Sequence, residues 1–137
     1  MKITELFKVP KNRVGRIVTN GAKLKAHEES TAVFLTQFGF NIEYILPTNT
    51  YKTHSPDFLV NSAIWETKSP DGSGNSTVGR QFHTASKQAD RLILDLRRIK
   101  LPAEKAKRQA LMRFEKSRNI KALLLITKDD KLLDVKK

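Results

Sequence analysis

The segment Pro56–Lys68, with the sequence PDFLVNSAIWETK, constrains the fold more than any other part of the chain. Two runs of strand-forming residues flank Asn61-Ser62, which is typical of a β-hairpin closed by a two-residue turn. Such a turn would place Asp57 opposite Glu66, with Cβ atoms about 4.5–5.5 Å apart, and alternation would put Lys68 on the same face. Two opposed carboxylates repel each other unless a cation lies between them, and an oxygen-only pair suits Mg²⁺.

Alternating helices and strands are predicted for the rest of the chain. Apolar spacing indicates helices at 24–38, 78–90 and 102–117, and strands at 40–46, 91–99, 121–127 and 131–135, with polar turn residues at 48–55. Residues 1–23 are weakly patterned and are expected to form an irregular lead-in, with a short helix around Thr4–Lys8. The order predicts a single α/β domain over residues 24–137, in which helices flank a mixed β-sheet.

A third acid is predicted on the first helix. Glu28 shares the apolar stripe of Leu24, Ala32 and Leu35, whereas Glu29 is turned about 100° away. An acid on an apolar stripe needs a partner, and a metal ion or Lys68 would serve. Glu28 is therefore the better candidate of the two by helical geometry.

The chain is strongly basic, with a formal net charge of +12. Residues 80–137 hold 17 Lys and Arg against 7 Asp and Glu. This asymmetry favours a polyanionic partner, nucleic acid before membrane. Cysteine is absent, which excludes disulfides, thiolate zinc sites and cysteine nucleophiles. Neither a signal peptide nor a membrane span is apparent, so we expect a cytoplasmic protein, or one delivered into the cytoplasm of a target cell.

Two further groups of residues allow more than one interpretation. Five basic residues of the C-terminal half could hold flanking phosphates or simply form a solvated basic face: Arg80, Lys87, Arg91, Arg97 and Arg98. Histidine offers a different chemistry, because His54 or His83 could run a metal-free acid–base ribonuclease, with His27 a surface residue or a neighbour of the site. The histidines have no ligand-like spacing.

The segment PDFLVNSAIWETK also resembles the PD-(D/E)XK nuclease signature, through Pro56-Asp57 and Glu66-Thr67-Lys68. Together with HEESTAVFLTQFGFNIEYILP and ASKQADRLILDLRRI, it is similar to the C-terminal tRNA-cleaving toxin domain of contact-dependent inhibition proteins of the CdiA type. This resemblance covers roughly residues 24–126. It implies a restriction-endonuclease-like core and a divalent-metal endonuclease that acts on tRNA and is neutralised by a cognate immunity protein.

The resemblance also assigns roles. Glu28, Asp57 and Glu66 would bind the metal ion, Lys68 would orient or activate the attacking water, and Gln88 on the following helix would support the site. The immunity protein of so basic a toxin is expected to be acidic. Two alternatives stay open: a DNA endonuclease of the same fold, and a nucleic-acid-binding module without catalysis.

Overall fold

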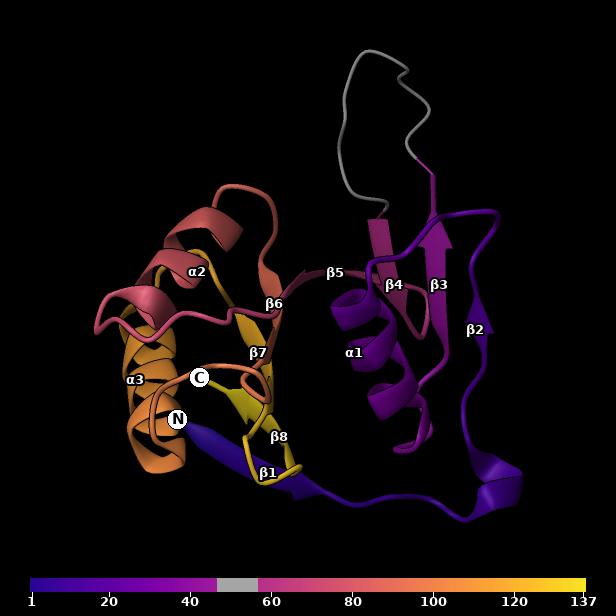
Figure 1. Ribbon diagram of the computed structural model, residues 1–137, viewed down its shortest axis with the longest axis horizontal. Helices are drawn as coiled ribbons and strands as arrows, with labels where there is room; N and C mark the ends of the chain where they lie inside the picture. Colours follow the sequence, from indigo (N-terminus) through magenta and orange to yellow (C-terminus); the bar gives the residue numbers. More distant parts are fainter. Residues whose placement is uncertain (47–56) are drawn as a thin grey trace. The chain divides into compact units, whose positions relative to one another are not determined.

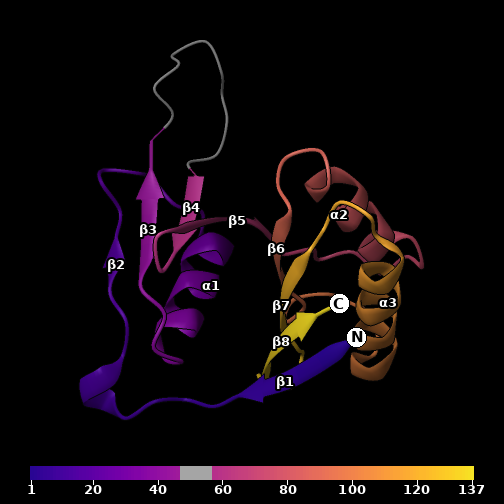
Figure 2. The same ribbon diagram turned by 180° about the vertical axis from the view of Figure 1, so that it is seen from behind.

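The computed structural model describes residues 1–46 and 57–137, with the side chain of Asp57 outside the described part. The chain forms two compact units (Figures 1 and 2). Unit 1 comprises Met1–Phe7 and Glu66–Lys137, and unit 2 comprises Lys8–Trp65. Unit 2 is therefore one continuous segment inserted after the first strand of unit 1.

Unit 1 is a mixed sheet with two helices. Its strands follow the order β1-β8-β7-β6-β5, where β5, β6 and β7 are parallel and β7, β8 and β1 are antiparallel. The elements are β1 (Lys2–Leu6), the second half of β5 (Ala63–Lys68), α2 (Thr77–Ala85), β6 (Arg91–Asp95), α3 (Ala103–Lys116), β7 (Ala122–Ile126) and β8 (Leu132–Lys136).

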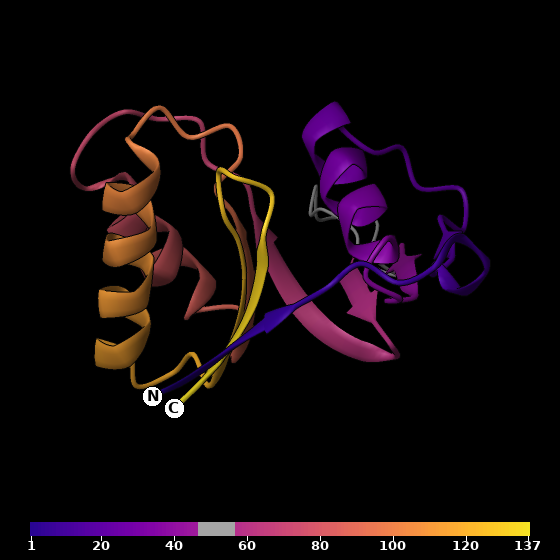
Figure 3. The same ribbon diagram turned by 90° about the horizontal axis from the view of Figure 1, so that it is seen from below.

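The core of unit 1 lies between the sheet and its two helices, which Figure 3 shows on the same side of the strands. Strands β6 and β7 are nearly continuous apolar runs, as expected for central parallel strands that are buried on both faces. Leu92 and Leu94 of β6 face Val78 and Phe82 of α2 in one buried cluster, which Phe114 of α3 completes.

Unit 2 is a smaller sheet with one helix. The strand order is β5-β4-β3-β2, with β2 and β3 parallel and the other pairs antiparallel. The elements are a 3₁₀ turn at Lys11–Arg13, β2 (Ile17–Val18), α1 (Ala26–Thr36), β3 (Ile42–Ile45), β4 (Asp57–Val60) and the first half of β5. Gly39 reverses the direction of the chain after α1. Its φ of +88° is a left-handed backbone conformation that favours glycine.

Several sequence predictions are confirmed, and others need correction. The α/β class, the mixed pairing, the hairpin and all three long helices are present. The irregular lead-in with a short helix is wrong, because residues 2–6 and 17–18 are strands. The second helix is shorter than predicted, since it ends at Ala85. The predicted polar turn at 48–55 lies outside the described residues. Within the described part of the chain, no helix is both long and apolar enough to cross a membrane.

Candidate functional site

The predicted hairpin is present, with the predicted turn. Asn61 and Ser62 have φ values of 48° and 72°, and two consecutive positive φ angles define the type I′ turn that suits the twist of a two-residue hairpin. The pairing follows the predicted register: Val60 with Ala63, Leu59 with Ile64, and Phe58 with Trp65. The apolar pattern and the turn residues together fix this register.

The predicted pairing of Asp57 with Glu66 is not part of the described register. Asp57 pairs with Ile45 of β3, and Glu66 pairs with Leu92 of β6, because β5 changes partner after Trp65. Asp57 belongs to unit 2 and Glu66 to unit 1. The approach of the two carboxylates therefore stays a prediction, and Pro56 lies outside the described residues.

Glu66 and Lys68 are brought together as predicted. The Lys68 Nζ atom lies 3.6 Å from the Glu66 Oε1 atom, and their side chains are 22% and 25% exposed, respectively. Both residues project from one face of β5, since they pair with Leu92 and Leu94 of the buried core. A cation and a carboxylate are thus held side by side on a half-buried strand, where a ligand can still reach them.

Glu28 lies in the first turn of α1. Its Oε1 atom accepts a hydrogen bond of 2.9 Å from the backbone N–H of Lys25, which satisfies a free donor at the start of the helix. Glu28 is half-buried and Glu29 is exposed, as the helical geometry predicted. The carboxylate therefore has a structural task within unit 2 in addition to any role as a ligand.

Tyr44 is a residue that the sequence prediction missed. It is 2% exposed, and its hydroxyl donates a 3.3 Å hydrogen bond to the backbone carbonyl of Glu28. Burial, and then the charges of Glu28 and Glu29, raise the pKa of Tyr44 far above its ordinary value of 10.0. The spacing of Ile42 and Tyr44 on a strand was the signal that could have placed this tyrosine against the helix.

The predicted acids would offer a metal ion only carboxylate oxygens, and oxygen ligands suit a hard cation. Glu66 fits such a role because its side chain, which lies beside Lys68, is 25% exposed. Among the side chains that the structure describes, no group of three or more His, Asp or Glu residues could hold a metal ion. Asp57 is not among them, so a complete ligand set rests on the resemblance.

Three of the predicted phosphate-binding residues carry exposed side chains in unit 1. Arg80 lies on α2, Lys87 in the turn after it, and Arg91 at the start of β6. Their exposure is compatible both with a nucleic-acid interface and with a solvated basic face.

Arg97 and Arg98 have structural partners. The Arg97 guanidinium forms a hydrogen-bonded ion pair with the buried Asp95 carboxylate, with an Nη2–Oδ2 distance of 2.8 Å. Arg98 donates from Nε to the backbone carbonyl of Ser69, at 2.8 Å, and to its hydroxyl, at 3.1 Å. Because Ser69 directly follows Lys68, Arg98 ties the end of β5 to the loop after β6. The sequence signal for this ion pair was an acid at the end of a predicted strand, Asp95, followed two positions later by a basic residue, Arg97.

The supporting glutamine is not where the sequence predicted. Gln88 lies in the turn beyond α2, with an exposed side chain, because the helix ends at Ala85. His83 is exposed on α2 and His27 is half-buried on α1. His54 lies outside the described residues.

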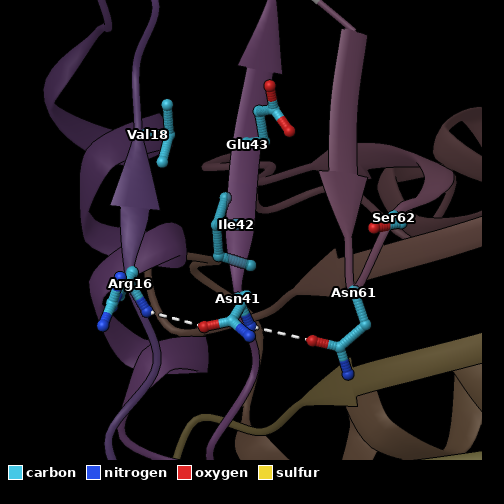
Figure 4. Close-up of a pocket in the computed structure, with 7 residues that line it drawn as sticks. All are labelled: Arg16, Val18, Asn41, Ile42, Glu43, Asn61 and Ser62. Atoms are coloured by element: carbon cyan, nitrogen blue, oxygen red, sulfur yellow. Dashed lines mark hydrogen bonds between the residues drawn. The ribbon is translucent and has the colours of Figure 1, made fainter.

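Unit 2 also contains an open pocket of about 610 Å³ on the face of its sheet away from α1 (Figure 4). Asn41 connects the walls of this pocket. The Asn41 Oδ1 atom accepts a hydrogen bond of 3.0 Å from the Arg16 backbone N–H, and the Asn41 backbone N–H donates one of 2.9 Å to Asn61 Oδ1. Val18, Ile42, Glu43 and Ser62 complete the lining. The two asparagines here link neighbouring strands where backbone pairing ends.

Comparison with known families identifies the chain. The sequence profile of the contact-dependent growth inhibition CdiA C-terminal domain matches residues 53–132, more than half of the chain. The chain belongs to the CdiA C-terminal domain family. It is thus a toxin domain of contact-dependent growth inhibition. The matched residues include Asp57, Glu66 and Lys68, and they leave out Glu28.

This CdiA C-terminal domain is also similar to a solved structure, that of the CdiA-CT/CdiI toxin and immunity complex from Burkholderia pseudomallei. The TM-score is 0.67 at 12% sequence identity, and the alignment covers 90% of this chain and 100% of that chain. At so low an identity the likeness concerns the fold alone. No curated protein matches the sequence of the chain.

Proposed function

We propose that this toxin domain is a metal-dependent endonuclease that hydrolyses phosphodiester bonds of RNA, with tRNA as the expected substrate. The observation that carries the proposal is the ion pair of Lys68 with Glu66 on a half-buried strand. Together with Asp57 at the start of the neighbouring strand, this pair forms the PD…ExK pattern. A PD-(D/E)XK core is part of the proposal.

In this mechanism Lys68 supplies positive charge to the reacting phosphate. An ammonium group is a compact cation that can stabilise charge as it develops on the transition state, and Glu66 fixes its position. Glu28, Asp57 and Glu66 would hold the cation. When bound, a divalent cation polarises a phosphoryl oxygen and lowers the pKa of a bound water.

The charge distribution supports a polyanionic substrate. Unit 1 holds 19 Lys and Arg against 10 Asp and Glu, a net charge of +9, whereas unit 2 has a net charge of +3. The Glu66–Lys68 pair thus belongs to the more basic unit. Such a field attracts nucleic acid and increases the rate of association.

An immunity protein is the second proposed partner. The Burkholderia pseudomallei structure that this chain resembles is a complex of a toxin with an immunity protein. A cognate immunity protein for the present domain would be acidic, since charge complementarity to a chain of net charge +12 favours association. Delivery of the domain into the cytoplasm of a target cell would expose it to tRNA.

Cleavage assays on matched variants test the proposal. Lys68→Ala and Glu66→Gln should each lower the rate of tRNA cleavage in Mg²⁺ by about 100-fold or more, the usual effect of removing one electrostatic contact to a transition state. The control is Lys136→Ala, because Lys136 forms an ion pair of 3.9 Å with Asp134 at the same i, i+2 spacing on β8. This control should cleave at the wild-type rate.

The outcomes separate the competing functions. Wild-type rates in both Lys68→Ala and Glu66→Gln would refute the assignment, and circular dichroism would show that each variant is folded. Cleavage that persists in EDTA would favour a histidine-based ribonuclease. Faster degradation of plasmid DNA than of tRNA would favour a DNA endonuclease, and binding without any cleavage would favour a non-catalytic module.

A further inference from the structure

The N-terminal end of α2 has free hydrogen-bond donors. Ser76 is the N-cap residue, but its side chain makes no capping hydrogen bond. Within the described part of the chain, the backbone N–H groups of Val78 and Gly79 have no acceptor. Uncapped N–H groups at the start of a helix carry partial positive charge and attract anions.

A buried hydroxyl at the same place also lacks a partner. Thr77, the first residue of α2, is 2% exposed, and its Oγ1 atom has no hydrogen-bond partner among the described residues. Oγ1 points toward the preceding loop: a Cβ atom on Gly72 would lie 2.8 Å from it, and one on Gly74 would lie 3.7 Å away. Because Gly72 has no Cβ atom, the loop can approach the hydroxyl this closely. A buried hydroxyl without a partner is unfavourable, so a ligand that accepts its hydrogen bond would stabilise the site.

A cation reaches the first turn of α2 from the neighbouring helix. Arg113 of α3 packs against Gly79 so closely that a Cβ atom there would meet its Cζ and Nη2 atoms at 2.9 Å. With glycine at this position the guanidinium can lie directly against the first turn of α2, and any larger residue would displace it. The next residue, Arg80, is exposed and adds a second positive charge.

From these observations we infer that the N-terminal turn of α2 is a phosphate-binding site. The Thr77 hydroxyl and the N–H groups of Val78 and Gly79 are its donors, and Arg113 neutralises the charge of the ligand. A glycine-containing loop that leads into a helix N-terminus is well suited to such an anion. The ligand that we assign is a backbone phosphate of the nucleic-acid substrate, and this assignment rests on the proposed nuclease function.

Direct titration tests the site without reference to cleavage. Inorganic phosphate is added to the ¹⁵N-labelled wild-type chain, and the amide resonances are compared with those in sodium chloride of equal ionic strength. The amides of Val78 and Gly79 should shift with a saturating dependence on phosphate concentration, and the response should weaken in Arg113→Gln. Unchanged resonances for these two amides would overturn the site.

Binding to tRNA in EDTA tests the origin of the phosphate. Arg113→Gln should lower the slope of log Kd against log salt concentration by about 1, the effect of losing one phosphate contact. Arg108→Gln is the matched control, because Arg108 is an exposed arginine of the same helix and the same charge is removed. It should change the slope by less.

The two measurements fail in different ways. If Val78 and Gly79 respond to phosphate but the wild-type chain binds neither tRNA nor DNA, the anion site stands and the proposed nuclease function falls. If the chain binds and cleaves tRNA but Arg113→Gln behaves like Arg108→Gln, the nuclease proposal stands and the assignment of the ligand to a substrate phosphate is overturned.

Discussion

Tyr44 shows how one side chain links the helix and the sheet of unit 2. Its ring lies against Phe58 in an edge-to-face arrangement, with a centroid distance of 5.1 Å. Its hydroxyl donates to the carbonyl of Glu28 in α1. The ring therefore contributes apolar packing, while the hydroxyl satisfies a carbonyl near the start of the helix. Ionisation of this phenol would place a negative charge in a buried site near two glutamates.

Replacement of Tyr44 by Phe should change how stability depends on pH. Because the folded state raises the pKa of Tyr44 above its unfolded value of 10.0, its contribution is complete below about pH 10 and is lost as the pH rises further. Near pH 7, Tyr44→Phe should be less stable by about 1 kcal/mol, the value of one hydrogen bond. Above pH 10 this difference should shrink. In the wild-type protein Tyr44 ionises more readily in the unfolded chain than in the folded one, which favours unfolding, and phenylalanine has no such ionisation.

Denaturant unfolding of both proteins from pH 7 to pH 11 measures this effect. Taking the difference between the two proteins removes the contribution of the lysines and of Tyr51, which both proteins share. A difference in the free energy of unfolding that stays constant over the whole range would contradict the predicted ionisation of Tyr44.

The β4–β5 hairpin has a turn whose second residue, Ser62, is not the residue type best suited to its backbone conformation. Ser62 has φ 72°, a left-handed conformation that glycine adopts more readily than serine. Ser62→Gly should therefore raise the free energy of unfolding by about 0.5–1 kcal/mol, since Asn-Gly is the preferred type I′ sequence.

Ser86→Gly provides the matched control for this prediction. Ser86 has φ −63°, so the same substitution there only adds freedom to the unfolded chain and should destabilise the protein. Its hydroxyl also donates a 2.8 Å hydrogen bond to the carbonyl of His83, which the substitution removes. Changes of equal sign in the two variants, measured by denaturant unfolding, would argue against strain at Ser62.

Elements with a strong local pattern were predictable from the sequence, and the others depend on distant partners. The hairpin follows from Asn61-Ser62, and α3 follows from the helical spacing of Ala103, Ala106, Ala110 and Phe114, of which the last three are buried and Ala103 is exposed. Strand β1 has no such pattern, because KITEL is mostly exposed and is defined by its pairing with β8. The sequence continues in helical spacing beyond Ala85, which explains why α2 was predicted too long.

The same distinction applies to the candidate site. Glu66 and Lys68 were predictable as neighbours because strand alternation is local. The change of partner along β5 was not predictable, since it depends on β6, which lies more than twenty residues later in the chain. Similarly, the sequence does not show that Arg98 has a partner, whereas in the fold its Nε atom donates a hydrogen bond to the backbone carbonyl of Ser69.

The connectivity of the chain makes unit 1 depend on both of its ends. The first seven residues belong to unit 1, and the chain returns to this unit only at Glu66. Strand β1 covers the edge of β8, where Ile3 pairs with Val135 and Glu5 with Leu133. Val135 is fully buried and Leu133 is 5% exposed. Unit 2, by contrast, is continuous from Lys8 to Trp65 and contains no part of β1.

Deletion of residues 1–6 should therefore destabilise unit 1 selectively. Loss of β1 exposes the apolar edge of β8, and exposure of one or two large apolar side chains lowers the free energy of unfolding by at least about 2 kcal/mol. Amide hydrogen exchange measures both units in one sample. The amides of Leu94 and Leu124, in β6 and β7, should exchange faster after the deletion, while those of Tyr44 and Leu59, in unit 2, should change little. Equal acceleration in all four strands would mean that the chain unfolds as one cooperative body, and the division into two units would then have no energetic counterpart.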